Sequence, residues 1–227
     1  MSQSAPRYLK VRDLGLCGYE EALAIQQALV AARQRGEGVD TLLFVEHPPV
    51  FTVGRRRTAR ANVLEAGDTP VVEVSRGGDV TWHGPGQLVG YPILALAPDE
   101  RDLHRTLRRL EDAIIAALAD VLGAAGRRAR RREGYTGVWC DEKKIASLGV
   151  AVQGWVTFHG FALNVDPDLA WFQRINPCGL ESQVMGSLAS LGAPIPPAAD
   201  LRQHLAAAVA HAFERELLPD AETPEER

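Results

Sequence analysis

The sequence predicts an α+β fold, because strand-like and helix-like segments are mixed along the chain without the regular alternation of a doubly wound sheet. Three observations lead to this prediction. Short apolar runs typical of strands recur from residue 8 onward, the clearest helical pattern spans Asp102 to Leu122, and a glycine-rich stretch between Arg76 and Tyr91 separates two strands.

Four strands and one helix are expected before the glycine-rich stretch. Leu23, Gln26, Leu29 and Val30 recur at helical spacing, and Gly36-Glu37-Gly38 ends that helix. The turn His47-Pro48-Pro49 divides an apolar segment into two strands. The expected strands span residues 8–14, 41–45, 50–53 and 71–74, and the helix spans residues 18–35.

The stretch from Arg76 to Tyr91 contains five glycines, and Gly77-Gly78 and Gly84-Pro85-Gly86 mark two bends in it. Between the bends the chain would be extended, with alternate side chains on opposite faces: Val80 and Trp82 on one, and Asp79, Thr81 and His83 on the other. One interpretation is a substrate platform, with glycine amides at a polar head group and Trp82 against an apolar tail. The other is a glycine-rich hairpin with a core tryptophan.

The second half of the chain is expected to hold further strands, a long amphipathic helix and a C-terminal helix. Five apolar residues mark one face of the long helix, and Gly123 lies just past its expected end. Asp141-Glu142-Lys143 joins a hairpin, and residues 176–179 form a turn. The expected strands span residues 88–96, 137–140, 144–152 and 156–165, and the expected helices span 102–122, 166–172 and 200–217.

Composition indicates a globular protein of 227 residues, 46% hydrophobic and 24% charged. We expect one domain over residues 1–219 and an acidic, disordered tail over residues 220–227. The net charge of −4 argues against a general nucleic-acid binder, and no apolar run approaches the ~18 residues of a membrane span. Three distant cysteines without a Cys-x-x-Cys pair fit a reducing cytoplasm and give no hint of a metal site.

Cys178 is the cysteine whose neighbours suggest chemistry. Cys17 and Cys140 have the pattern of small buried residues, whereas Pro177 and Gly179 place Cys178 on a sharp turn. A thiol there can be exposed beside a backbone N–H, as an acyl-transfer nucleophile requires. Because an unperturbed thiol has a pKa of ~8.5, it needs a neighbouring base or cation, for which the candidates are Lys144, His83 and His159.

Each candidate partner of the thiol has two interpretations. Lys144 begins a strand whose alternate positions Ala146, Leu148 and Val150 are apolar, so its ammonium would be partly desolvated and its pKa lowered, while Lys143 points the other way. Alternatively, Lys144 extends from the strand end into solvent. His83 and His159 lie in glycine-bounded strands, where they line a pocket or make structural hydrogen bonds.

Two arginine runs, residues 55–57 and 127–132, have the pattern of solvated loops. On an acidic protein they can instead form docking patches for an acidic partner. Nucleic acid is the rival partner, but no aromatic residues are interleaved with these arginines.

Four segments, taken in order, resemble the lipoyl(octanoyl) transferases, which transfer octanoyl groups from acyl carrier protein to proteins. They are Arg76-Gly-Gly-Asp-Val-Thr-Trp-His-Gly-Pro-Gly-Gln-Leu-Val-Gly-Tyr-Pro, Lys144-Ile-Ala-Ser-Leu-Gly, His159-Gly-Phe-Ala-Leu-Asn and Asn176-Pro-Cys-Gly. Their order and spacing match the family from about Leu42 to Leu191. Four motifs in order are far more specific than any one of them.

The resemblance implies a mixed sheet flanked by helices, similar to the catalytic domains of biotin protein ligase and lipoate-protein ligase. It implies that the Cys178 thiolate attacks the octanoyl thioester and that a lysine ε-amine then takes the octanoyl group from the acyl-enzyme. Lys144 would lower the thiol pKa and serve as acid and base. The residues implied to line the acyl pocket are Arg76, Gly77, Gly78, Asp79, Val80, Thr81, Trp82, His83, Ser147, Leu148, Gly149, Gly160, Phe161 and Ala162.

The implied donor is octanoyl acyl carrier protein, and the implied acceptors are the lipoyl domains of 2-oxoacid dehydrogenase E2 subunits and the glycine cleavage H protein. Both kinds of partner are typically acidic, which would give the arginine runs a role. We expect a monomer that acts without nucleic acid or a membrane. Exchange of a thioester for an amide runs downhill, so no cofactor, ATP or metal is required.

Burying an octanoyl tail at ~0.8 kcal/mol per methylene is worth roughly 5 kcal/mol. This selects medium chains but does not reject a chain one carbon longer. Three rival hypotheses stay open at this point: an ATP-dependent lipoate or biotin ligase on the same fold, a Cys-His hydrolase using Cys178, and a non-catalytic adaptor that binds a carrier protein.

Overall fold

The computed structural model describes residues 6–176 and 184–219, and its strands form two sheets. The larger sheet has eight strands in the order β11-β1-β2-β6-β10-β9-β8-β7. Strand β1 pairs in parallel with β2 and β11, and the other neighbours are antiparallel, so the sheet is mixed. Its strands are β1 (Tyr8–Leu16), β2 (Asp40–Glu46), β6 (Gln87–Ile93), β7 (Ala129–Arg132), β8 (Tyr135–Cys140), β9 (Lys143–Gln153), β10 (Val156–Asn164) and β11 (Glu216–Leu217).

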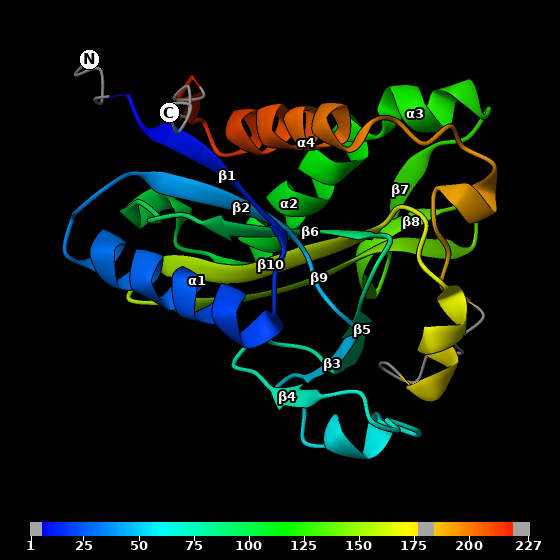
Figure 1. The fold of residues 1–227 in the computed structure, drawn as a ribbon. Coiled ribbons are helices and arrows are strands. Elements are labelled where there is room, and N and C mark those ends of the chain that lie inside the picture. Colours follow the sequence, from blue (N-terminus) through cyan, green and yellow to red (C-terminus); the bar gives the residue numbers. More distant parts are fainter. Residues whose placement is uncertain (1–5, 177–183, 220–227) are drawn as a thin grey trace, which may run out of the picture.

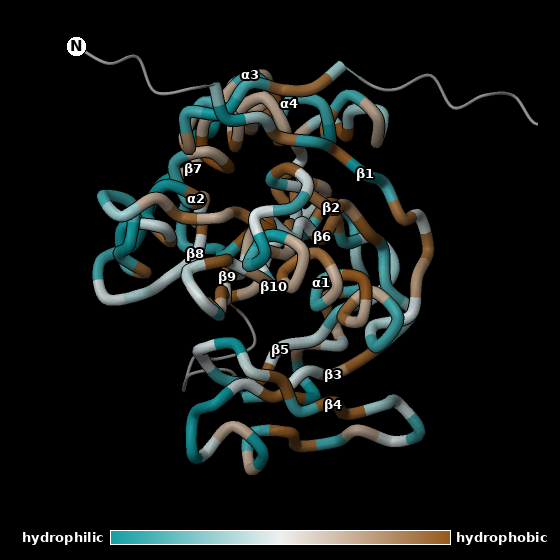
Figure 2. The backbone as a smooth tube through the Cα atoms, turned by 90° about the vertical axis from the view of Figure 1, so that its left-hand side faces the viewer, coloured by the Kyte–Doolittle hydropathy of each residue, from teal (hydrophilic) through white to brown (hydrophobic). Residues whose placement is uncertain are grey.

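Helices cover both faces of this sheet, which confirms the α+β prediction (Figure 1). Helix α1 (Tyr19–Gln34) packs on one face against β6 and β10. Helices α2 (Leu103–Ala117) and α4 (Ala198–Ala212) pack together over the other face, and the short α3 (Ala119–Ala124) follows α2. Figure 2 shows hydrophobic segments along the central strands and hydrophilic ones in the outer turns. Within the described chain, no helix has the length and apolar character needed to cross a membrane.

The smaller sheet, in the order β4-β3-β5, lies beyond one end of the larger one (Figure 1). It consists of β3 (Val50–Val53), β4 (Val71–Glu73) and β5 (Val80–His83). Phe51, Trp82 and Phe172 are fully buried in a separate hydrophobic cluster beneath it. Phe172 comes from a 3₁₀ helix at Leu169–Arg174, and further 3₁₀ helices in the described parts of the chain span Arg60–Asn62, Pro98–Glu100 and Ala189–Leu191.

Two expectations about the helices were wrong. The helix expected over residues 102–122 is divided at Leu118, and Gly123 lies inside α3 rather than past its end. The bend keeps both Leu118 and Leu122 fully buried as the chain turns toward β7. The C-terminal helix ends at Ala212 instead of residue 217, because the chain there turns back to add β11 beside β1.

The basic run at residues 127–132 is also not a loop, because most of it forms edge strand β7. Antiparallel pairing with β8 brings it beside the β8–β9 turn, where Arg127 pairs with Asp141 and Arg130 with Glu142. This part of the sequence therefore neutralises much of its own charge.

A buried ion-pair cluster holds the C-terminal turn in place. Arg215 is fully buried and donates to both oxygens of Glu100, at 2.7 and 3.1 Å, and to Asp40 at 3.0 Å. Burial alone would raise the pKa of Glu100, but hydrogen bonds from Arg215 and the Ala97 N–H, with the charges of Arg215 and Arg7, lower it to about 2. Glu100 therefore stabilises the folded state at pH values above the ordinary pKa of a glutamate, and this stabilisation is lost as the pH falls towards 2.

Replacing Arg215 with alanine should lower the free energy of unfolding by about 3–5 kcal/mol, because two buried carboxylates lose their fully buried partner and keep only the more exposed Arg7, Arg33 and Arg109. Urea unfolding at pH 7 measures this loss. The matched control is Arg202→Ala, which removes a half-exposed pair with Asp13 and should cost less than ~1 kcal/mol. Equal losses in the two variants would contradict the buried role. Repeating the measurement from pH 5 to pH 2.5 should show a weaker acid dependence in Arg215→Ala than in the parent.

Candidate active site

A cavity of about 570 Å³ lies where the glycine-rich turn meets strands β6, β9 and β10 of the large sheet. Its volume falls within the ~300–1,000 Å³ typical of small-molecule sites. Thirteen of the fourteen residues implied for the acyl pocket line it, and so does Lys144. Those thirteen are Arg76, Gly77, Gly78, Asp79, Val80, Thr81, His83, Ser147, Leu148, Gly149, Gly160, Phe161 and Ala162.

Arg76 supports the glycine-rich turn from within. Its buried guanidinium donates to the carbonyl oxygens of Gly77, Asp79 and Thr52 at 2.9–3.1 Å, and to the Thr52 hydroxyl at 2.8 Å. The side chain passes between Gly54 and Gly149, where an added Cβ would lie 2.9 Å from Arg76 in each case. The residue thus fixes the turn that forms one wall of the cavity.

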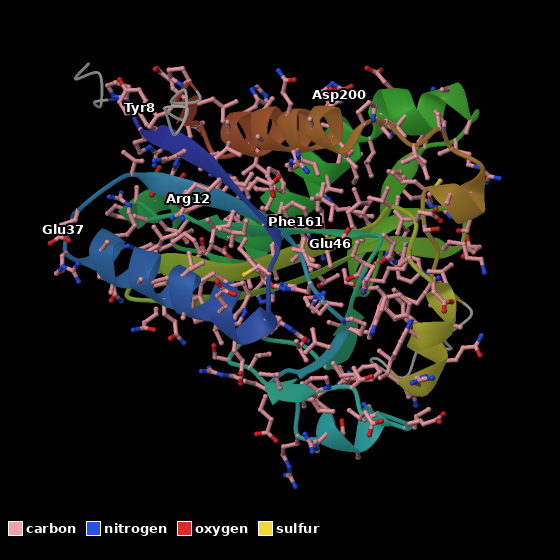
Figure 3. The ribbon with its side chains drawn as sticks, viewed as in Figure 1. Tyr8, Arg12, Glu37, Glu46, Phe161 and Asp200 are labelled. Carbon is pink, nitrogen blue, oxygen red and sulfur yellow. The ribbon has the colours of Figure 1, made fainter. Side chains whose placement is uncertain are left out.

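Glycines also clear the surface of the large sheet at the cavity. Gly149 and Gly160 are directly paired across β9 and β10. The ring of Phe161, labelled at the centre of the sheet in Figure 3, occupies the place where Gly90 lacks a side chain, because a Cβ there would lie 2.3 Å from the ring. At Gly160 a Cβ would lie 2.1 Å from the Gly90 carbonyl oxygen, so a larger residue there requires the backbone to shift.

Lys144 is half-buried and lines the cavity, whereas Lys143 is exposed, as expected. The strict alternation expected from Lys144 to Val150 is interrupted, because the β8–β9 register shifts and Ile145 and Ala146 are both buried in one cluster. The lysine stem crosses Gly137, where an added Cβ would lie 2.4 Å from Cε. Its Nζ lies 6.0 Å from the centroid of the Trp139 ring.

A chain of side-chain amides determines which nitrogen of His83 carries the proton. Asn164 donates its Nδ2 to the Gly186 carbonyl at 2.8 Å, so its Oδ1 accepts from Gln87 Nε2 at 2.9 Å. The Gln87 Oε1 must then accept from His83 Nδ1 at 3.2 Å. His83 is therefore the Nδ1–H tautomer, and its Nε2 carries the lone pair of a hydrogen-bond acceptor.

Two histidines in the cavity wall are neutral at pH 7. Burial, together with the charges of His47 and Arg76, holds the pKa of His83 well below its ordinary value. Burial and the charge of Arg76 lower the pKa of His159 to about 4, and its ring nitrogens contact Tyr19 Oη at 3.4 Å and Ser75 Oγ at 3.2 Å. Neither imidazole supplies a cation that would stabilise a nearby thiolate, whereas a lysine can carry that charge and also release a proton.

Cys178 lies outside the described residues, so its role and its pairing with Lys144 stay predictions. Trp82 does not line the cavity: it is buried in the hydrophobic cluster of the small sheet, and its ring stacks on Trp171 at 5.4 Å.

Several cavity residues were not identified from the sequence. Met185 comes from the segment that follows Cys178, and Arg56 comes from the first arginine run. Tyr91 follows Val89 at the spacing of one strand face, which is a signal that could have added both to the site. Val150 alternates with Leu148 on the strand of Lys144, which is a signal of the same kind. The others come from distant elements and carried no such signal: Tyr19, Leu103, Leu107, Gly134, Tyr135, Thr136 and Phe172.

Comparison with known proteins identifies close relatives of the whole chain. Residues 18–210 match a family model described as the lipoyl protein ligase A/B catalytic domain. An octanoyltransferase of Geobacter metallireducens is 50% identical over 218 residues, which cover 96% of this chain and 99% of the relative. An octanoyltransferase of Rubrobacter xylanophilus is 50% identical over 198 residues, covering 83% and 86% of the two chains.

Solved structures of ligases share the fold at much lower sequence identity. A lipoate-protein ligase A bound with ATP superposes with a TM-score of 0.70 at 14% identity, covering 97% of this chain and 90% of that one. A biotin protein ligase from Aquifex aeolicus, in complex with biotin and ATP, gives a TM-score of 0.55 at 12% identity, covering 90% and 70%. These likenesses confirm the fold predicted from the sequence motifs and concern the fold alone.

Proposed function

We propose that this chain, which belongs to the octanoyltransferases of the lipoyl protein ligase A/B catalytic domain family, moves the octanoyl group through a thioester on Cys178. The chain transfers octanoyl groups in protein lipoylation, because its relatives are named octanoyltransferases and its family model describes a lipoyl protein ligase catalytic domain. The route through an acyl-enzyme and the roles of Cys178 and Lys144 are the proposal.

One observation supports this route most strongly: Lys144 and described residues on either side of the cysteine segment line the cavity or are linked by hydrogen bonds to its glycine-rich turn. The chain before Cys178 reaches Asn176, whose N–H bonds to the Asn62 carbonyl at 2.8 Å. After it, Met185 lines the cavity and forms a β-bridge with Lys144. The described residues on either side of the thiol motif therefore contact Asn62, which binds Asp79 of the glycine-rich turn, and Lys144.

The chemistry follows in two exchanges. Lys144 accepts the thiol proton, the Cys178 sulfur forms a bond to the acyl carbon, and the donor thiolate leaves and takes a proton from Lys144. The neutral amine of the acceptor lysine then attacks the same carbon, the C–S bond to Cys178 breaks and an amide is formed. The proton that the amine loses passes through Lys144 to the leaving Cys178 thiolate, which returns to the thiol. Each exchange balances without another reactant, and the neutral His83 Nε2 can accept a hydrogen bond from a substrate N–H.

We propose octanoyl acyl carrier protein as the donor and lipoyl domains as acceptors, including those of 2-oxoacid dehydrogenase E2 subunits and the glycine cleavage H protein. One structural neighbour belongs to an archaeal lipoylation system, in which a bipartite lipoate protein ligase of Thermoplasma acidophilum acts with its E2 lipoyl domain. We also propose that the protein acts as a monomer and that residues 1–219 form a single domain. The acidic residues 220–227 lie outside the described residues.

Intact-mass spectrometry tests the acyl-enzyme. Mixing the protein with octanoyl carrier protein should add one octanoyl group, and a lipoyl domain should then remove it. The adduct should disappear in Cys178→Ser and persist in Cys17→Ser and Cys140→Ser, whose thiols are buried. Absence of any adduct on folded protein would contradict the proposal. Formation of an octanoyl adenylate from octanoate and ATP would favour the ligase instead.

A further inference from the structure

Four exposed arginines lie within one short segment beside the cavity: Arg55, Arg56, Arg57 and Arg60. Residues 54–64 contain no carboxylate. Of these arginines, Arg56 lines the cavity and pairs with the buried Asp79 at 3.6 Å. For the other three, no ion pair forms with any residue of 6–176 or 184–219. Arg55, Arg57 and Arg60 thus carry exposed positive charge that no described carboxylate neutralises.

The segment is held firmly in this position. Arg55 N–H donates to the Arg76 carbonyl at 3.1 Å and Arg56 N–H donates to the Gly78 carbonyl at 3.2 Å. The side-chain amide of Asn62 donates to both oxygens of Asp79, at 2.9 and 2.8 Å. The basic segment is therefore fastened to the glycine-rich turn that forms the cavity wall.

The second arginine run, residues 127–132, has less unpaired positive charge than the first run, although it contains more arginines. Four of its five arginines pair with carboxylates of the same chain: Arg127 with Asp141, Arg130 and Arg132 with Glu142, and Arg131 with Asp112 and Glu111. An acidic partner would have to compete with these carboxylates. Arg55, Arg57 and Arg60 of the first segment can bind an acidic partner without displacing a described carboxylate of this chain.

We infer that Arg55, Arg57 and Arg60 form the docking surface for the acyl donor, an acidic protein that carries its acyl group on a phosphodiester-linked thiol arm. This rests on the proposed donor. When the thioester lies inside the cavity, the anionic phosphodiester and the acidic carrier surface lie at its entrance, where the arginines attract them. Lipoyl domains are acidic as well, but they bring a cationic lysine and no phosphodiester to this entrance. The charges therefore favour the donor over the acceptor.

The test is the triple variant Arg55→Glu, Arg57→Glu and Arg60→Glu, which leaves Arg56 intact. Its KM for octanoyl carrier protein should rise at least ~10-fold, the lower end of the range for electrostatic steering, with kcat little changed. Its rate with octanoyl-N-acetylcysteamine, a thioester without carrier or phosphate, should stay within twofold of the parent. Discharge of the preformed acyl-enzyme by a lipoyl domain should also stay within twofold.

The matched control is Arg128→Glu, Arg130→Glu and Arg132→Glu, which changes the net charge by the same amount. Its KM for the carrier protein should change less than threefold. Equal rises in KM for the two triple variants, or a loss confined to the lipoyl-domain step, would overturn the docking surface. Failure of the docking surface can be told apart from failure of the proposed reaction. If only the docking surface is wrong, every variant still forms the acyl-enzyme from the small thioester. If the proposed reaction is wrong, neither donor acylates any variant.

Discussion

Replacing Lys144 with alanine is expected to slow acylation of Cys178 by about 10²–10⁴-fold, the usual contribution of a positioned acid or base. The reason is that the cavity histidines are neutral, so the lysine is the group that can both hold a positive charge near a thiolate and exchange a proton. Single-turnover formation of the octanoyl adduct, followed by intact mass, measures the rate. Lys144→Arg should not restore it, because an arginine does not release its proton in proteins.

Lys143→Ala provides the control, since the neighbouring lysine is exposed and does not line the cavity. This variant should acylate at nearly the parental rate. His159→Ala should slow acylation less than Lys144→Ala does. A larger loss in His83→Ala or His159→Ala than in Lys144→Ala would support a cysteine–histidine hydrolase.

Replacing Gly137 with alanine should slow acylation by about 10²-fold, although residue 137 is absent from the cavity wall. An added methyl group would lie 2.4 Å from Lys144 Cε and 2.8 Å from the Ala146 carbonyl oxygen, so the lysine stem must move. Gly137 also has a φ of 140°, and its N–H donates to the buried Glu111 at 2.8 Å. The pH dependence of Cys178 alkylation should shift to higher pH in both Gly137→Ala and Lys144→Ala, because each variant removes the lysine's charge from the thiolate.

Strain from the unusual backbone angle must be separated from displacement of the lysine. Gly126→Ala serves this purpose, because Gly126 has a φ of 67° and a Cβ there meets no atom within 4 Å. It should cost stability in urea unfolding, of order 1 kcal/mol, and leave the alkylation profile unchanged. If Gly137→Ala behaves in the same way, the glycine serves the fold and does not position the lysine.

The local patterns predicted most elements, because they depend on neighbours in the sequence. The strand before Pro48 and the strand after Pro49 were both found, and α1 begins one residue after Gly18. The errors occurred where distant contacts decide the structure. The arginines of β7 form a strand because β8 pairs with them, and residues 216–217 form a strand because β1 is adjacent. Neither partner can be inferred from charge or periodicity.

The cavity shows the same division. The motif segments that begin at Arg76, Lys144 and His159 line one cavity. Their resemblance to a known family implied this convergence, whereas their spacing in the sequence does not predict it. Val80 and Trp82 are buried in one cluster, as strand alternation predicted, yet Trp82 does not line the cavity. A strand covered on both faces gives no sequence signal for which face meets a ligand. Tyr19 from α1 and Leu103 from α2 could only be found once the helices were placed.

The pairing of Tyr8 with Glu216 brings the first and last described strands to one edge of the large sheet. Figures 1 and 2 place this edge at the opposite end of the molecule from β3, β4 and β5, which adjoin the glycine-rich turn. An affinity tag placed before residue 8 or after residue 217 would therefore leave the substrate entrance unobstructed. The enzyme could be immobilised through either end on a biosensor and presented to carrier protein and lipoyl domain in turn.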